Sequence, residues 1–206
     1  MGFPVDREQA ERFAELIERL RPHVGRALFV AGGQAADDVV LHEFDGGRDA
    51  AYIVVARRQM NVAVRVTVGF GPDVPGTHLI YDATAGAMQG KARPFDVDLA
   101  DEQAKVFALM PVQIEAIAVS AKQPSAGRVL RVDFQDARGE RIQAALPFYF
   151  KIEAADGSLT KSGYFATQRD GCFSSQPDLL AEATVGCKIV IRSLLTGREE
   201  AVVLER

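Results

Sequence analysis

The feature that most constrains the fold is a change of hydrophobic period near Gly25. Before this glycine, apolar residues recur with the spacing of an amphipathic helix. After it, they form short alternating or continuous runs separated by Gly, Asp and Pro. Short runs of this kind are typical of antiparallel β-structure. The sequence therefore predicts a mostly β protein preceded by one helix.

The helical pattern covers residues 6–20. Asp6 stands at the N-cap position, and Pro22 followed by Gly25 ends the helix. A single amphipathic helix cannot bury its own apolar face, so we expect this face to pack on the following sheets or on a partner. The face consists of Ala10, Phe13, Ala14, Leu16, Ile17 and Leu20.

Six strands are predicted in the first half of the chain. The clearest turn is DGGRD at 45–49, whose glycines suit a hairpin. We assign residues 1–24 to the N-terminal helix and connector, and residues 25–110 to a first β-sandwich domain. The predicted strands are 38–44, 51–57, 62–69, 77–82, 93–99 and 104–110.

Seven further strands are predicted after Met110. Seven short strands in about ninety residues have the count and spacing of an immunoglobulin-like sandwich. We assign residues 111–206 to this second β-sandwich domain, which the short link at Met110 and Pro111 should hold close to the first. The predicted strands are 113–120, 128–135, 145–153, 160–167, 171–177, 186–193 and 199–205.

Charge and hydropathy exclude several partners. The formal net charge of −4 and the scattered Lys and Arg residues provide no basic surface for a phosphate backbone, so no nucleic acid is expected. No apolar run is long enough for a membrane span, and the acidic N-terminal stretch does not fit a signal peptide. We expect no membrane association, and export only if the chain is part of a larger secreted protein.

The residue types that usually carry catalysis are few and scattered. The three histidines, His23, His42 and His78, lie in different predicted elements without the spacing of metal ligands. The nucleophile-elbow, P-loop and dinucleotide-binding motifs are absent. We therefore expect no catalytic residue, no metal site and no cofactor. The two cysteines, Cys172 and Cys187, have no CxxC partner, and whether a disulfide joins them stays open beside the interpretation as two buried thiols.

Acidic pairs are the remaining candidates for glycoside hydrolysis or calcium binding. Asp96 and Asp98 alternate with apolar residues, which is typical of the solvated face of a strand, and Asp101–Glu102 fits an acidic turn. Neither chemistry is expected at these positions. The pairs are Asp37 with Asp38, Asp96 with Asp98, and Asp101 with Glu102.

Aromatic side chains are the candidates for a sugar-stacking surface. Alternation along strands directs about half of these rings inward, and the chain contains no Trp, so we interpret most of them as core. Tyr149 and Tyr164 are the candidates for exposure, and the residues of a binding site stay unassigned. The aromatic set is Tyr52, Phe70, Tyr81, Phe148, Tyr149, Phe150, Tyr164 and Phe165.

Three stretches resemble the non-catalytic parts of bacterial glycoside hydrolases. IYDATAG at 80–86 and PFDVDLADEQAKVFALMP at 94–111 are similar to the end of the β-sandwich that follows the catalytic barrel, and 162–197 resembles the last strands of macroglobulin- or fibronectin-like domains. The helix-to-strand junction at 10–30 fits the passage from the last barrel helix. The resemblance implies a noncatalytic accessory module whose partner is an upstream catalytic barrel or a polysaccharide.

Two alternative functions stay open. One is an independent protein- or glycan-binding module of an exported multidomain protein, in which loops at the ends of a sandwich contact the ligand. The other is a small hydrolase, for which the sequence offers little support because acids and histidines are not gathered in any motif.

Overall fold

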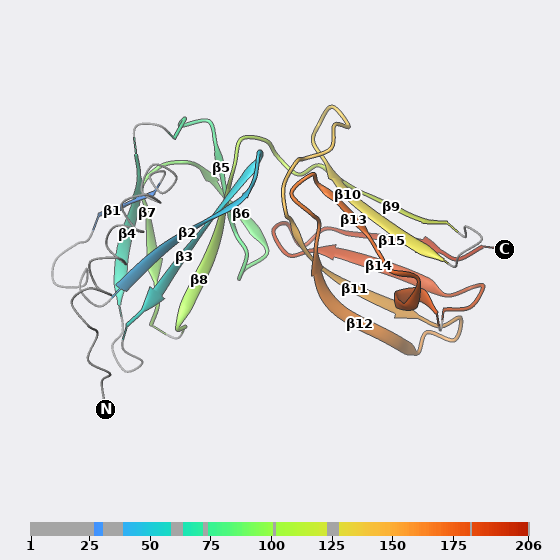
Figure 1. Cartoon of the computed structure of the whole chain (residues 1–206). Helices are drawn as coiled ribbons and strands as arrows, with labels where there is room; N and C mark the ends of the chain where they lie inside the picture. Colours follow the sequence, from blue (N-terminus) through green and yellow to red (C-terminus); the bar gives the residue numbers. More distant parts are fainter. Residues whose placement is uncertain are drawn as a thin grey trace, which may run out of the picture.

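The computed structural model describes residues 27–30, 39–58, 64–71, 74–100, 102–122, 128–181 and 183–205. The helix predicted at 6–20 lies outside these residues. In the described part, the chain forms antiparallel sheets and a short 3-10 helix, η3 (Pro177–Leu180) (Figure 1). The prediction of a mostly β protein is confirmed.

The residues before Pro111 form two sheets around one core. Alternation along the strands directs Val55, Val66, Val97 and Phe107 to this common interior, where each is almost fully buried. The three-stranded sheet has the order β1 (Ala27–Val30), β4 (Arg65–Phe70), β7 (Phe95–Asp98). The five-stranded sheet has the order β2 (Val39–Gly47), β3 (Ala50–Arg57), β8 (Ala104–Met110), β5 (Leu79–Asp82), β6 (Ala87–Lys91).

The residues after Pro111 form two more sheets around a second core. Phe134, Phe148, Phe150 and Ile191 are buried in it because they occupy alternate positions of strands in the facing sheets. The three-stranded sheet has the order β13 (Cys172–Ser174), β10 (Val129–Gln135), β9 (Ala116–Lys122). The four-stranded sheet has the order β12 (Leu159–Ala166), β11 (Pro147–Glu153), β14 (Lys188–Ser193), β15 (Glu199–Val203).

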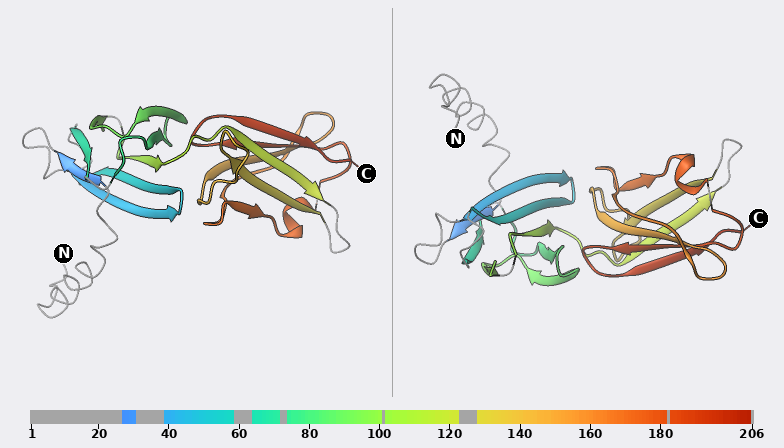
Figure 2. Two further views of the ribbon diagram at one scale, coloured as in Figure 1. Left: turned by 90° about the horizontal axis from the view of Figure 1, so that it is seen from above. Right: turned by 90° about the horizontal axis from the view of Figure 1, so that it is seen from below.

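The five-stranded sheet buries residues on both of its faces. Ile53 and Phe107 point into the first core, whereas Tyr81, Ala108 and Met110 belong to the second core. The second core therefore extends across the Met110–Pro111 link onto the outer face of the first half, and the two halves lie end to end (Figure 2).

Three elements differ from the prediction. β1 was not expected, because ALFV is a short apolar run without alternation; it forms by pairing with β4. β6 was not expected, because its sequence AMQGK lacks β-branched residues. Its residues are mostly exposed in the structure, and the strand forms by pairing with β5 across a bulge at Ile80/Tyr81. The strand predicted at 171–177 is confined to β13, because Pro177 has no backbone N–H to donate to a ladder and begins η3 instead. The other predicted strands that fall within the described residues are found with small shifts of their ends.

Candidate functional site

The junction between the two halves is built from the tip of the β2–β3 hairpin and the segment 141–146. The Asp49 N–H donates to the Gln143 carbonyl oxygen at 3.0 Å, and the Gln143 N–H donates to Asp49 Oδ2 at 2.8 Å. The Ala145 N–H donates to the Gly46 carbonyl oxygen at 2.7 Å. Backbone groups of both halves are thus paired as in a short sheet, which holds the hairpin in one position.

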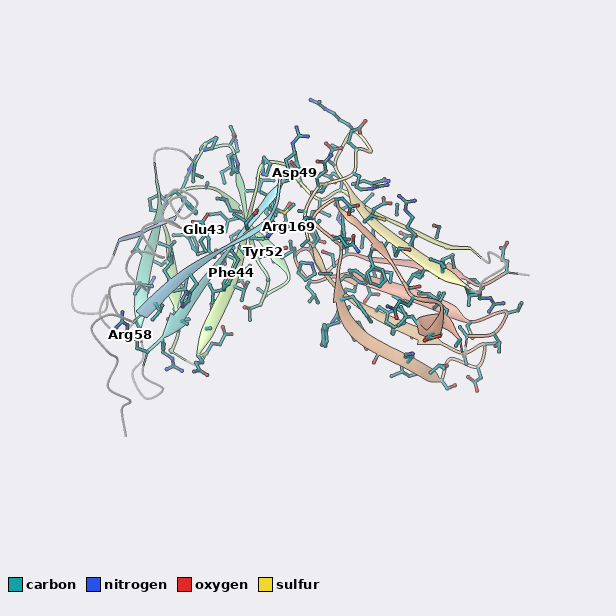
Figure 3. All side chains as sticks on the ribbon, viewed as in Figure 1. Glu43, Phe44, Asp49, Tyr52, Arg58 and Arg169 are labelled. Carbon is teal, nitrogen blue, oxygen red and sulfur yellow. The ribbon has the colours of Figure 1, made fainter. Side chains whose placement is uncertain are left out.

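Three side chains complete this junction. The Tyr52 hydroxyl donates to the Ala145 carbonyl oxygen at 2.6 Å, and burial raises the pKa of Tyr52. Arg169 Nη1 lies 3.3 Å from Asp45 Oδ2 in an exposed ion pair, which contributes little by itself. Figure 3 shows Asp49, Tyr52 and Arg169 together where the two halves meet. The sequence predicted a close link but offered no sign of this long-range pairing.

The two buried carboxylates in the described part of the chain have structural partners. Asp82 accepts hydrogen bonds from the N–H groups of Thr84 and Ala85 and from the Gln89 amide, which caps the turn between β5 and β6. Asp133 lies 3.7 Å from both Arg131 and Arg141. Both carboxylates are therefore held by the turns and strands around them.

Of the acidic pairs picked out in the sequence, Asp96 and Asp98 are exposed, whereas Glu102 is half-buried. Asp96 accepts hydrogen bonds from the Thr67 hydroxyl at 2.7 Å and from Arg65 at 2.9 Å, and these bonds lower the pKa of Asp96. Asp98 accepts from the Ala100 N–H at 2.8 Å, and Glu102 lies 3.7 Å from Lys105. Asp37, Asp38 and Asp101 lie outside the described residues.

The structure separates the described histidines. His42 lies on β2, at the edge of the five-stranded sheet, and His78 directly precedes β5, with β3 and β8 between the two strands. His23 lies outside the described residues. Across the described ranges, no three His, Cys, Asp or Glu side chains form a group that could hold a metal ion.

The two cysteines are free thiols. Cys172 lies on β13, and the buried Cys187 directly precedes β14, so they belong to different sheets. Thr184 Oγ1 lies 3.4 Å from Cys187 Sγ, a hydrogen-bonded contact near the end of the second core. The interpretation as two buried thiols holds for Cys187, whereas Cys172 is only half-buried.

An aromatic row crosses the outer face of the four-stranded sheet. Tyr164 of β12, Tyr149 of β11 and Arg192 of β14 are in register on neighbouring strands, and we call these three residues the tyrosine row. The ring centroids of the two tyrosines are 5.2 Å apart, and Arg192 Cζ lies 5.4 Å from the Tyr149 centroid. Of the two candidates for exposure, Tyr164 is 71% exposed and Tyr149 is half-buried. The sequence analysis did not identify Arg192 as part of this surface, because strand register decides which side chains lie beside it.

A shallow hollow of about 400 Å³ lies at the edge of the second half, between β12, β13 and η3. Phe165 and Phe173, with ring centroids 5.3 Å apart, contribute the apolar part of its wall. Lys161 and Asp178 contribute charges of opposite sign. Both phenylalanines also pack on the second core, so the hollow is a gap between sheet edges with a partly polar wall.

Comparisons with known proteins identify no family. No family model matches the chain, and no curated protein matches its sequence.

In the described residues, no helix has the length and apolar character needed to cross a membrane.

Solved structures with a partial likeness are enzymes much longer than this chain. β-Glucuronidase 3 of Bacteroides uniformis aligns with 83% of this chain and 25% of its own length, at 11% identity and a TM-score of 0.35. The β-glucuronidase of Ruminococcus gnavus aligns with 77% of this chain and 36% of its own, at 10% identity and a TM-score of 0.26. An FMN-binding β-glucuronidase of Facaelibacterium prausnitzii aligns with 84% and 35%, at 12% identity and a TM-score of 0.25. The chain thus spans about a quarter to a third of their length, and at these scores the likeness carries no assignment.

Proposed function

We propose that this chain is a noncatalytic accessory module of a carbohydrate-active enzyme, in which two β-sandwiches, the second immunoglobulin-like, brace a catalytic domain or position it on its substrate. The observation that carries the proposal is the junction. The Asp49 N–H donates to the Gln143 carbonyl oxygen and the Gln143 N–H donates to the Asp49 carboxylate. Together with a core that reaches across Met110, this pair of bonds favours one rigid body over two tethered domains. A rigid spacer is what a positioning role requires.

The pKa values of the described acidic side chains support the noncatalytic part of the proposal. Hydrolysis of a glycoside needs a general acid whose pKa is raised and a second carboxylate about 5–10 Å away. The described acids whose pKa values shift are Asp96, Glu153 and Asp156, and hydrogen bonds from Thr67, Lys151 and Ser158 lower all three values. A lowered pKa keeps a carboxyl group ionised at neutral pH, which is the opposite of what a general acid needs.

Two measurements test this function. The coding sequence directly upstream of Met1 should encode a catalytic barrel, and the isolated chain should show no turnover on a panel of aryl glycosides and esters. Turnover that disappears when a described carboxylate is mutated would contradict the proposal.

A barrel-bearing protein allows a test of the bracing role itself. Tyr52→Phe removes the side-chain bond across the junction and should lower activity on a polymeric substrate while leaving activity on a soluble aryl glycoside unchanged. Thr77→Val, which removes an exposed hydroxyl outside both the junction and the tyrosine row, is the matched control for the junction. Equal effects of both variants on both substrates would argue against a positioning role.

The exposed tyrosine row favours a second candidate, an independent glycan- or protein-binding module of an exported multidomain protein. Exposed aromatic rings beside a cation are common at recognition surfaces. Upstream coding sequence with further sandwich domains in place of a barrel would favour this candidate.

A further inference from the structure

The tyrosine row combines an apolar surface with a positive charge. Tyr164 is 71% exposed, Tyr149 is half-buried beside it, and the exposed Arg192 lies over the Tyr149 ring. Cross-strand packing and the cation–π contact hold these groups in a fixed order across the sheet. The surface is therefore ordered before any ligand arrives, which lowers the entropic cost of binding.

Arg192 contributes an exposed positive charge to this surface. Its neighbour Lys151 lies 2.6 Å from Glu153, an ion pair that raises the pKa of Lys151 and lowers that of Glu153. Glu199 of β15 is in register with Arg192, yet Arg192 forms no ion pair with any described residue. The guanidinium donors of Arg192 are thus available to an anion from solution.

We propose that the tyrosine row binds an acidic polysaccharide. The apolar face of a sugar ring stacks on Tyr164 and Tyr149, and the carboxylate of that sugar or its neighbour pairs with Arg192. Tyrosine rings present an apolar face at little conformational cost, and a planar guanidinium matches the two oxygens of a carboxylate. This inference rests on the glycan-associated function proposed above and adds the ligand class and the residues that bind it.

The net charge of −4 makes the expected binding selective. A chain with this charge is repelled by polyanions as a whole, so retention on an acidic polymer has to come from a local site and not from a general electrostatic field. Glu199, the register neighbour of Arg192, opposes a carboxylate ligand, and removing its charge should strengthen binding.

Affinity electrophoresis of the full chain in gels that contain polygalacturonate, with dextran as the neutral control polymer, tests the proposal. We expect retardation by polygalacturonate and none by dextran. Arg192→Gln and Tyr164→Ala should each weaken binding about tenfold or more, which is the effect of losing one charge-assisted or stacking contact. Glu199→Gln should increase the retardation.

Matched controls separate the site from general effects of charge and exposed rings. Arg138→Gln removes the same charge from the exposed turn between Asp136 and Glu140, and Phe44→Ala removes an aromatic ring that is 55% exposed on β2. Neither control should change the retardation. Circular dichroism of each variant confirms that the β-structure is retained.

Three results would overturn the proposal. They are no retardation of the unaltered chain by polygalacturonate, equal retardation by dextran, and equal loss of binding in Arg138→Gln and Arg192→Gln. These results are separate from those that test the accessory function, because an upstream barrel and the absence of turnover are measured without any acidic polymer.

Discussion

The Tyr52 hydroxyl donates a 2.6 Å hydrogen bond to the carbonyl oxygen of Ala145, a residue 93 positions later in the chain. Tyr52 lies on β3 of the first half, and Ala145 lies in the segment that leads into β11 of the second half. The bond therefore couples the stability of one half to the position of the other. The first predictions concern this coupling.

Replacing Tyr52 with Phe should lower the free energy of unfolding by about 1 kcal/mol, because the Ala145 carbonyl loses its partner while the ring stays in place. Urea denaturation monitored by circular dichroism measures this change. Tyr164→Phe, on an exposed ring, should leave the midpoint unchanged. A Tyr52→Phe midpoint equal to that of the unaltered chain would show that the bond contributes nothing to stability.

Alkaline pH should destabilise the fold through two buried phenols. Burial raises the pKa values of Tyr52 and Tyr81 above the ordinary value. Above pH of about 10 the unfolded chain loses these protons while the folded chain keeps them, so the free energy of unfolding falls with pH by up to about 1.4 kcal/mol per unit for each phenol. Below that pH the two states bind the same number of these protons and the effect vanishes.

Urea midpoints measured from neutral to strongly alkaline pH test this dependence. Tyr52→Phe should show a smaller slope than the unaltered chain, because one of the two linked protons is removed. Identical slopes for the two proteins would contradict the assignment to Tyr52.

Gly171 should tolerate alanine much less than Gly157 does. Both glycines have positive φ, +79° and +83°, so a side chain is strained at either position. A Cβ on Gly171 would lie 1.9 Å from the Ile142 carbonyl oxygen, whereas a Cβ on Gly157 meets nothing within 4 Å. We expect Gly157→Ala to cost about 1–2 kcal/mol and Gly171→Ala at least about twice as much. Thermal melts compare the pair directly, and equal losses would contradict the close approach to Ile142.

The segment 112–206 should fold when expressed alone, because it carries both sheets of the second half. It should be less stable than the same region in the full chain, because Tyr81, Ala108 and Met110 no longer cover their side of the second core. Circular dichroism and urea denaturation of the segment test both statements. A disordered segment would show that the two halves share one indispensable core and that a boundary at Met110–Pro111 is wrong.

The strand pattern was largely predictable because it depends on local signals. Alternation at 145–153 and 186–193 marks residues that must bury one face, and the structure has β11 and β14 there. Where local signals were weak, the prediction failed. β1 and β6 were missed because they form by pairing with β4 and β5, and Pro177 ends β13 early. The helix at 6–20 and the domain boundary stay predictions.

The sequence by itself determined that this chain is mostly β and that its acids and histidines fall in no catalytic motif, because period, turn residues and motif spacing are properties of neighbours in the chain. Only the tertiary structure decided that Tyr52 bonds to Ala145, that the outer face of β3 and β8 closes the second core, and that Arg192 lies over Tyr149. These relationships depend on the register of strands and on the pairing of segments far apart in the chain. Many registers satisfy the same alternation of apolar residues, and the packing of the whole chain selects one of them.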